Sequence, residues 1–234
     1  MDNISVERVV NRFKNVKNNR KYQKKSTIKG KSGKKTNKNM QSDAIYWKNQ
    51  KKWRRTGMFV WIGIDVDNQY DEIKRVAKDV DKKIGFKNSC FTLPMHISLK
   101  ISFKIDKNDY ENIKNIIFQV FESVKPFEIA VKAIENHGNI CWIRMKDNPC
   151  LNALSAEING ILKEKHNIPL HEYDLDFLFH TSLFLDDDFD KVNMGYELVK
   201  DVVLPEKLIA NRFVIGVSES GNLGTYKVVD VIER

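Results

Sequence analysis

"LPMHISLKISF", residues 93–103, alternates apolar and polar side chains almost without a break. This period of two is typical of a β-strand with one buried face and one polar face. The polar face carries four residues, which are His96, Ser98, Lys100 and Ser102. A second stretch, "FLFHTSLFL" at residues 177–185, presents His180 and Ser182 with the same spacing. The chain therefore predicts two strands that each hold a histidine and a serine on one polar face.

The segments around these two strands repeat one order of elements. Apolar residues at helical spacing predict helices over 70–84, 108–124 and 149–162, and the acidic run "DDDFDK" opens another. Apolar runs predict further strands at "MFVWIGIDV", "PFEIAVKAIEN", "ICWIRMK", "RFVIGVSES" and "TYKVVDVIE". Strand, helix, histidine strand, helix and strand thus occur twice, followed by one extra strand. This repeat predicts two similar lobes, each a sheet with helices on one face.

Positive charge is concentrated toward the N-terminus. Residues 1–57 hold 18 Lys/Arg and 3 Asp/Glu, whereas residues 58–234 hold 22 and 28. Residues 18–43 consist largely of Lys, Asn, Ser and Gly, with too few apolar side chains to form a core. We therefore expect a basic, largely disordered arm over 1–57 and one domain of two pseudo-symmetric lobes over 58–234. The arm is either a solvated tail or a segment that contacts nucleic acid.

Cysteine usage and hydropathy predict a cytoplasmic protein. The three cysteines form no CxxC pair, and an odd count favours reduced thiols. The N-terminus shows no apolar run of signal-peptide length, and no segment approaches the length of a membrane span. We therefore expect no membrane partner.

Two histidines and two hydroxyls on facing strands suit one class of reaction. If helices cover the apolar face of each lobe, the two polar faces oppose each other and form a cleft. Cleavage of a phosphodiester needs a base for the nucleophile and an acid for the leaving oxygen. Neutral and protonated histidine fill these roles near pH 7. We therefore predict His96 and His180 as catalytic residues, without deciding which is base and which is acid.

The other polar side chains of the two strands are predicted to bind phosphate. The hydroxyls of Ser98 and Ser182 can donate to phosphate oxygens, and Lys100, on the same predicted face, adds positive charge. No HExxH or Cys/His spacing supplies further metal ligands, so we expect neither a metal nor another cofactor. The alternative is that both histidines are ordinary core or edge residues. His137 falls in a predicted turn and is given no role.

The motifs "HISL" and "HTSL", at residues 96–99 and 180–183, resemble the paired motifs of the 2H phosphoesterase superfamily. That superfamily includes the 2′-5′ RNA ligase-like proteins and the RNA 2′,3′-cyclic phosphodiesterases. The resemblance covers about residues 58–234. It implies an α+β, bilobal, duplicated fold, with two antiparallel sheets flanked by helices around a central cleft. It also implies metal-independent hydrolysis of RNA 2′,3′-cyclic phosphates or 2′-5′-linked nucleotides, with RNA or a nucleotide as partner.

The chain departs from the superfamily pattern at two points. Serine stands at both positions where many members have threonine, and Phe184 and Leu185 stand where a basic residue often follows the second motif. Phe184, on the predicted His180 face, either stacks on a nucleobase or packs in the core. Two other functions stay open on the sequence alone. One is a non-catalytic RNA- or nucleotide-binding module that uses the cleft and the basic arm, and the other is an interaction protein with vestigial histidines.

Overall fold

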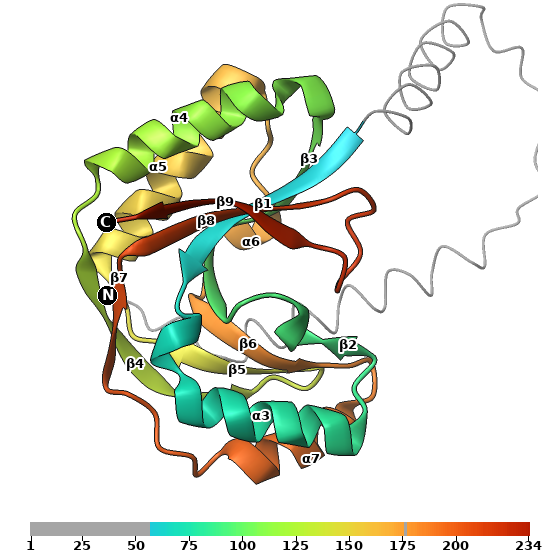
Figure 1. Ribbon diagram of the computed structural model, residues 1–234. Coiled ribbons are helices and arrows are strands. Elements are labelled where there is room, and N and C mark those ends of the chain that lie inside the picture. Colours follow the sequence, from blue (N-terminus) through green and yellow to red (C-terminus); the bar gives the residue numbers. More distant parts are fainter. Residues whose placement is uncertain (1–56, 176) are drawn as a thin grey trace, which may run out of the picture. The chain divides into compact units, whose positions relative to one another are not determined.

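The computed structural model describes residues 57–175 and 177–234 (Figure 1). The basic arm predicted over residues 1–57 lies outside these residues, apart from Gly57, which begins the first strand. Within the described part, no helix is both long enough and apolar enough to cross a membrane. Its cysteines Cys90, Cys141 and Cys150 are free thiols.

Two antiparallel sheets form the centre of the described part. The first has the strand order β3 (His96–Asp106), β1 (Gly57–Asp65), β8 (Arg212–Ser218) and β9 (Lys227–Glu233). The second has the order β2 (Asn88–Ser89), β6 (His180–Leu185), β5 (Ile140–Met145), β4 (Phe127–Asn136) and β7 (Lys207–Ala210). Neighbouring strands pair antiparallel throughout. The expected α+β class with two antiparallel sheets is confirmed.

Helices cover one face of each sheet. The helices α4 (Tyr110–Ser123) and α5 (Pro149–His166) contact each other and the first sheet. The helices α3 (Asp71–Ile84) and α7 (Phe189–Val199) contact each other, and α7 lies on the second sheet. Short helices join these elements, namely η1 (Asp67–Gln69), η2 (Cys90–Thr92), η3 (Lys107–Asp109) and α6 (Glu172–Leu175). Figure 1 shows the two helix pairs on opposite outer sides with both sheets between them, so the uncovered sheet faces point toward each other.

Capping residues set one boundary of each of two long helices. The side chain of Asn148 accepts a hydrogen bond of 2.9 Å from the backbone N–H of Cys150, and Pro149 is the first residue of α5. Gly85 ends α3 with a positive φ of 69°, and its N–H donates to the carbonyl of Asp81. These local signals explain why both helix boundaries were predictable.

The repeated order of elements is present, but each sheet takes strands from both halves of the chain. In the first sheet, β1 and β3 join β8 and β9 from the C-terminal end, and in the second β4 joins β5, β6 and β7. Helix α3 follows β1 in the chain yet packs against α7. The short edge strands β2 and β7 of the second sheet were not predicted. With strands exchanged between the two halves in this way, His96 and His180 lie at the start of equivalent strands in different sheets.

The alternation of β3 breaks after Ser98. Strand β1 pairs with β8 without a register shift, so its successive residues point to opposite faces. On β3, Ser98 pairs with Gly63 but Lys100 pairs with Ile62, which leaves Leu99 without a cross-strand partner. The shift turns Lys100 to the buried face of Ile62, opposite to Ser98. The prediction that Lys100 shares the polar face of Ser98 is therefore wrong.

Strand β6 has the same register shift at the same place in its motif. Ser182 pairs with Trp142, and the preceding residue of β5 pairs with Phe184, which leaves Leu183 without a cross-strand partner. Phe184 is consequently buried and stacks on Phe86, with the ring centroids 4.7 Å apart. Packing in the core is thus the observed state of Phe184. In both motifs the leucine marks a shift that buries the residue after it.

Candidate active site

The two histidines are held in the same orientation by their own strands. The Nδ1 atom of His96 lies 2.8 Å from the carbonyl oxygen of Pro94, and that of His180 lies 2.6 Å from the carbonyl oxygen of Leu178. A carbonyl oxygen only accepts hydrogen bonds, so Nδ1 carries the proton in both rings. Each neutral ring therefore keeps a free lone pair on Nε2, the atom available for proton transfer.

The two imidazoles lie within electrostatic range of each other. Burial lowers the pKa of His180 to about 4, and the charges of His96 and Arg144 act in the same direction. Burial also lowers the pKa of His96, although the carboxylate of Asp65 opposes this shift. Strands β3 and β6 contact each other, and His96 and His180 are both partly exposed residues. The fold thus brings together the two histidines that the sequence singled out.

A tryptophan stacks on each histidine. The ring centroids of Trp61 and His96 are 4.3 Å apart, and those of Trp142 and His180 are 4.0 Å apart, each pair with an interplanar angle of 30°. A flat contact of this kind restricts rotation of the imidazole. It also stabilises the protonated ring, because the face of an indole attracts a cation.

Trp61 reaches His96 because glycines leave room for its indole. A Cβ atom added at Gly63 would lie 2.4 Å from Cζ3 of Trp61, and one added at Gly216 would lie 2.2 Å from its Nε1. Gly216 is the cross-strand partner of Trp61 on β8, whereas Gly63 follows it by two residues on β1. The indole therefore lies flat on the first sheet and extends toward His96.

On the second sheet, a carboxylate holds Trp142 and brings a third histidine to the site. Glu135 Oε2 accepts from Nε1 of Trp142 at 3.4 Å and lies 3.0 Å from Nε2 of His137. The rings of His137 and Trp142 are 4.3 Å apart, so Trp142 lies between His137 and His180. The sequence predicted the β4–β5 turn that contains His137 but not this contact. The predicted turn pairs Glu135 with Trp142 across the two strands, and this pairing is the signal from which the contact could have been inferred.

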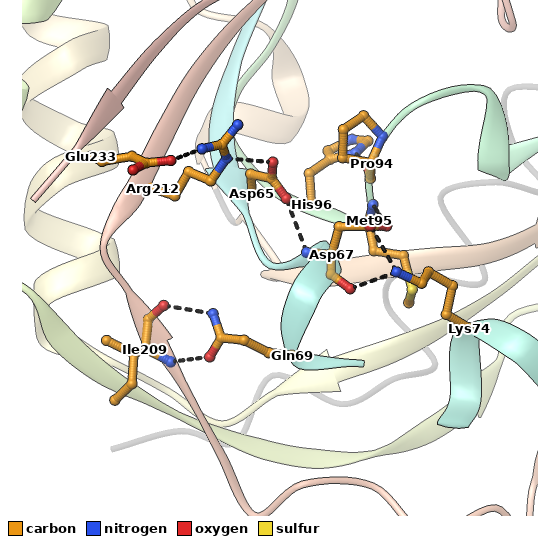
Figure 2. A network of polar contacts seen from close by, with 10 residues as sticks. All are labelled: Asp65, Asp67, Gln69, Lys74, Pro94, Met95, His96, Ile209, Arg212 and Glu233. Carbon is orange, nitrogen blue, oxygen red and sulfur yellow. Dashed lines mark hydrogen bonds and ion pairs between the residues drawn. The ribbon is translucent and has the colours of Figure 1, made fainter. Parts of the chain in front are cut away.

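The two histidines have neighbours of opposite charge, an acidic residue beside one and a basic residue beside the other. Asp65 is the cross-strand partner of His96, and Arg144 is the cross-strand partner of His180. Asp65 accepts a hydrogen bond of 2.9 Å from Nε of Arg212, as Figure 2 shows. Arg144 has a buried nitrogen, Nη1, without a hydrogen-bond partner. The charge difference gives the two rings different tendencies to hold a proton. Neither Asp65 nor Arg144 was predicted from the sequence.

A network around η1 fixes the chain just before His96 (Figure 2). Asp67 Oδ1 accepts from the backbone N–H of Met95 at 3.0 Å, and its Oδ2 accepts from Nζ of Lys74 at 2.8 Å. Burial alone would raise the pKa of Asp67, but the bonds from Lys74 and Met95 outweigh it and lower the pKa. The side chain of Gln69 pairs with the backbone of Ile209 on β7. The network therefore ties the start of β3 to both sheets.

The predicted phosphate-binding residues do not all lie beside the histidines. Ser98 and Ser182 lie two residues after their histidines and on the same sheet faces, so the structure groups them with the imidazoles. Lys100 is buried, and its ammonium forms an ion pair with the buried carboxylate of Asp174. The structure therefore does not place Lys100 with the histidines. In the described part of the chain, no group of three or more His, Cys, Asp or Glu side chains is arranged to hold a metal ion.

Several solved structures are similar in fold to this chain. Escherichia coli LigT in apo form aligns with a TM-score of 0.47 and 13% identity, covering 76% of this chain and 97% of that one. E. coli LigT complexed with 3′-AMP aligns with a TM-score of 0.46 and 13% identity, over 75% and 97%. A protein described as a phosphoesterase aligns with a TM-score of 0.47 and 11% identity, over 74% and 96%. No protein-family model and no curated protein matches the chain. At such low identity, any functional assignment depends on the side chains described above.

Proposed function

We propose that the protein is a metal-independent phosphodiesterase of the 2H type. It acts on RNA 2′,3′-cyclic phosphates or 2′-5′-linked nucleotides, in the cytoplasm. One observation carries the proposal: two imidazoles from different sheets, each with a free Nε2 atom, lie within electrostatic range of each other. Acid–base cleavage of a phosphodiester needs two such groups on opposite sides of one phosphorus atom.

The charged neighbours support a division of roles between the histidines. His180 lies beside Arg144 and is the base, because a nearby cation favours the neutral imidazole. His96 lies beside Asp65 and is the acid, because a nearby carboxylate favours the protonated ring. In hydrolysis of a 2′,3′-cyclic phosphate, His180 takes a proton from water as its oxygen bonds to phosphorus. The bond from phosphorus to one ribose oxygen breaks, and His96 protonates that oxygen. The hydroxyls of Ser98 and Ser182 donate to the non-bridging oxygens.

A substrate panel tests this proposal. The full chain is incubated with a 2′,3′-cyclic nucleotide, a 2′-5′-linked dinucleotide and a 3′-5′-linked dinucleotide, and the products are separated by chromatography. We expect turnover of the 2′,3′-cyclic nucleotide, the 2′-5′-linked dinucleotide or both. Without turnover, RNA binding that disappears when residues 1–57 are removed would favour the non-catalytic binding module instead.

The pH dependence should reflect both lowered pKa values. We expect kcat/KM to follow a bell-shaped profile with an ascending limb near the pKa of His180, about 4. The descending limb, where His96 loses its proton, should lie below its ordinary value of 6.5 because burial lowers that pKa. In Asp65→Asn the opposing carboxylate is gone, so the descending limb should move to lower pH, while asparagine still accepts from the N–H of Asp67. Steady-state rates across the acidic and neutral range measure both limbs. A shift to higher pH in this variant would contradict the role given to His96.

The glycine that leaves room for the indole of Trp61 should be important for catalysis. We expect Gly216→Ala to displace the indole toward His96 and to reduce kcat/KM by about 10- to 100-fold, the cost of misplacing a catalytic group by about 1 Å. Gly160→Ala on α5 is the matched control, because a Cβ there meets nothing within 4 Å. Steady-state kinetics and tryptophan fluorescence check the result. Unchanged kinetics in a folded Gly216→Ala protein would show that Trp61 does not position His96.

A further inference from the structure

Arg144 differs from the other arginines of residues 57–175 and 177–234. Arg212 bonds with carboxylates, Arg234 donates to backbone carbonyls, and Arg75 is exposed to solvent on α3. Arg144 is partly buried, and its Nη1 atom is buried without a hydrogen-bond partner. A buried cationic donor without a partner is costly, and a functional role of the group is one explanation for such a cost.

The two carboxylates whose charge acts on Arg144 form hydrogen bonds with other residues. Glu135 and Asp147 raise the pKa of Arg144 through their charge, but burial outweighs them and lowers it. Glu135 bonds with His137, and Asp147 accepts from Nδ2 of Asn152 at 2.8 Å. No ion pair within the described residues includes Arg144. A protein carboxylate therefore does not account for the free guanidinium nitrogen.

Strand register places Arg144 on the face that carries the proposed site. It is the cross-strand partner of His180 on β5, and Trp142, two residues before it, is the partner of Ser182. All four side chains consequently lie on one face of the second sheet. An anion held by Arg144 would lie beside the imidazole and the hydroxyl that the reaction uses.

We propose that Arg144 binds the phosphate group of the substrate through its guanidinium group, which belongs to a partly exposed residue. The planar guanidinium can donate to two oxygens of one phosphate. Lys100 cannot take this role, because its ammonium is held in a buried ion pair. The identity of the ligand as a phosphate ester rests on the proposed phosphodiesterase function. Held in this way, the non-bridging oxygens lie between the two imidazoles, with the attacking water on the His180 side and the leaving ribose oxygen on the His96 side. The same contact binds the phosphomonoester product.

Calorimetric titration of the full chain with inorganic phosphate tests the assignment without requiring turnover. We expect Arg144→Gln to raise the Kd for phosphate by about 10- to 100-fold, as the loss of a charge-assisted hydrogen bond implies. Arg144→Lys keeps the charge but not the planar fork, so its loss should be smaller. Arg75→Gln makes the same chemical change at an exposed position and should leave the Kd unchanged. An NMR titration should also show a raised pKa for His180 in Arg144→Gln, because a neighbouring positive charge is gone.

The outcomes separate this assignment from the proposed reaction. Equal phosphate affinity of Arg144→Gln and the unaltered protein, or no phosphate binding by the unaltered protein, overturns the role of Arg144. If Arg144→Gln does not fold, the guanidinium NMR signal of Arg144 in the unaltered protein decides: a shift on adding phosphate supports the role, and no shift overturns it. Phosphate binding through Arg144 without hydrolysis of any cyclic phosphate supports this assignment and contradicts only the proposed reaction.

Discussion

Replacing either His96 or His180 by alanine is expected to lower kcat on a 2′,3′-cyclic phosphate by on the order of 10²–10⁴-fold, because each change removes one of two proton transfers. The rings present equivalent Nε2 atoms, since each Nδ1 donates to a carbonyl of its own strand. The double variant should be little slower than the slower single variant, because the two groups act as a unit. Steady-state rates of all three variants measure this.

The pH profile of each single variant tests the assignment of roles. His180→Ala should lose the ascending limb, and His96→Ala should lose the descending limb. His171→Ala, at an exposed position before α6, serves as the control and should retain normal activity. Full activity in either His96→Ala or His180→Ala would contradict the two-histidine mechanism.

Asp174→Ala is expected to destabilise the protein by about 3–5 kcal/mol, the usual effect of removing one partner of a buried ion pair. The side chains of Lys100 and Asp174 are 2% and 0% exposed, so the variant leaves an ammonium in the interior without a counter-charge. Asp174 Oδ2 also accepts from the backbone N–H of His171 at 2.7 Å, and that bond is lost as well. The midpoint of urea unfolding measures the change in the free energy of unfolding.

An exposed ion pair supplies the matched control for this prediction. Lys87 and Asp187 are 2.9 Å apart, but their side chains are 64% and 85% exposed. Asp187→Ala should therefore leave the midpoint of urea unfolding nearly unchanged. The double change Lys100→Met with Asp174→Leu should recover much of the stability that Asp174→Ala loses, because it removes both buried charges. A cost below about 1 kcal/mol for Asp174→Ala would show that Lys100 does not depend on its partner.

Local patterns predicted most of the elements but not the faces of every strand residue. The boundaries at Asn148 and Gly85 depend on capping within a few residues of the chain, and such signals are readable in sequence. The position of Lys100 depends instead on pairing with β1, where Leu99 is the unpaired residue. Because an alternating pattern carries no sign of an unpaired residue, the shift is visible only once the partner strand is known.

The difference between local patterns and strand pairing also explains which site residues were predicted from the sequence. His96 and His180 belong to a repeated motif, and their serines follow at the strand period, so these four were identified. The residues that surround the imidazoles come from β1 and β5, whose pairing with the histidine strands the motif does not specify. Trp142 and Arg144 do alternate within "ICWIRM", but only the strand order places them beside His180. The sequence consequently predicted Lys100 beside the histidines, whereas the structure pairs Lys100 with Asp174 and places Arg144 opposite His180 on the neighbouring strand.

The time course of product formation by the full chain, given a 2′,3′-cyclic nucleotide in the presence of EDTA, tests the two-histidine mechanism most directly. The matched control is the double variant His96→Ala with His180→Ala. We predict that a single phosphomonoester accumulates at the same rate with and without EDTA, and that none accumulates with the double variant. Product formation that EDTA abolishes would contradict the mechanism, as would the absence of product above the level of the double variant from both this substrate and a 2′-5′-linked dinucleotide.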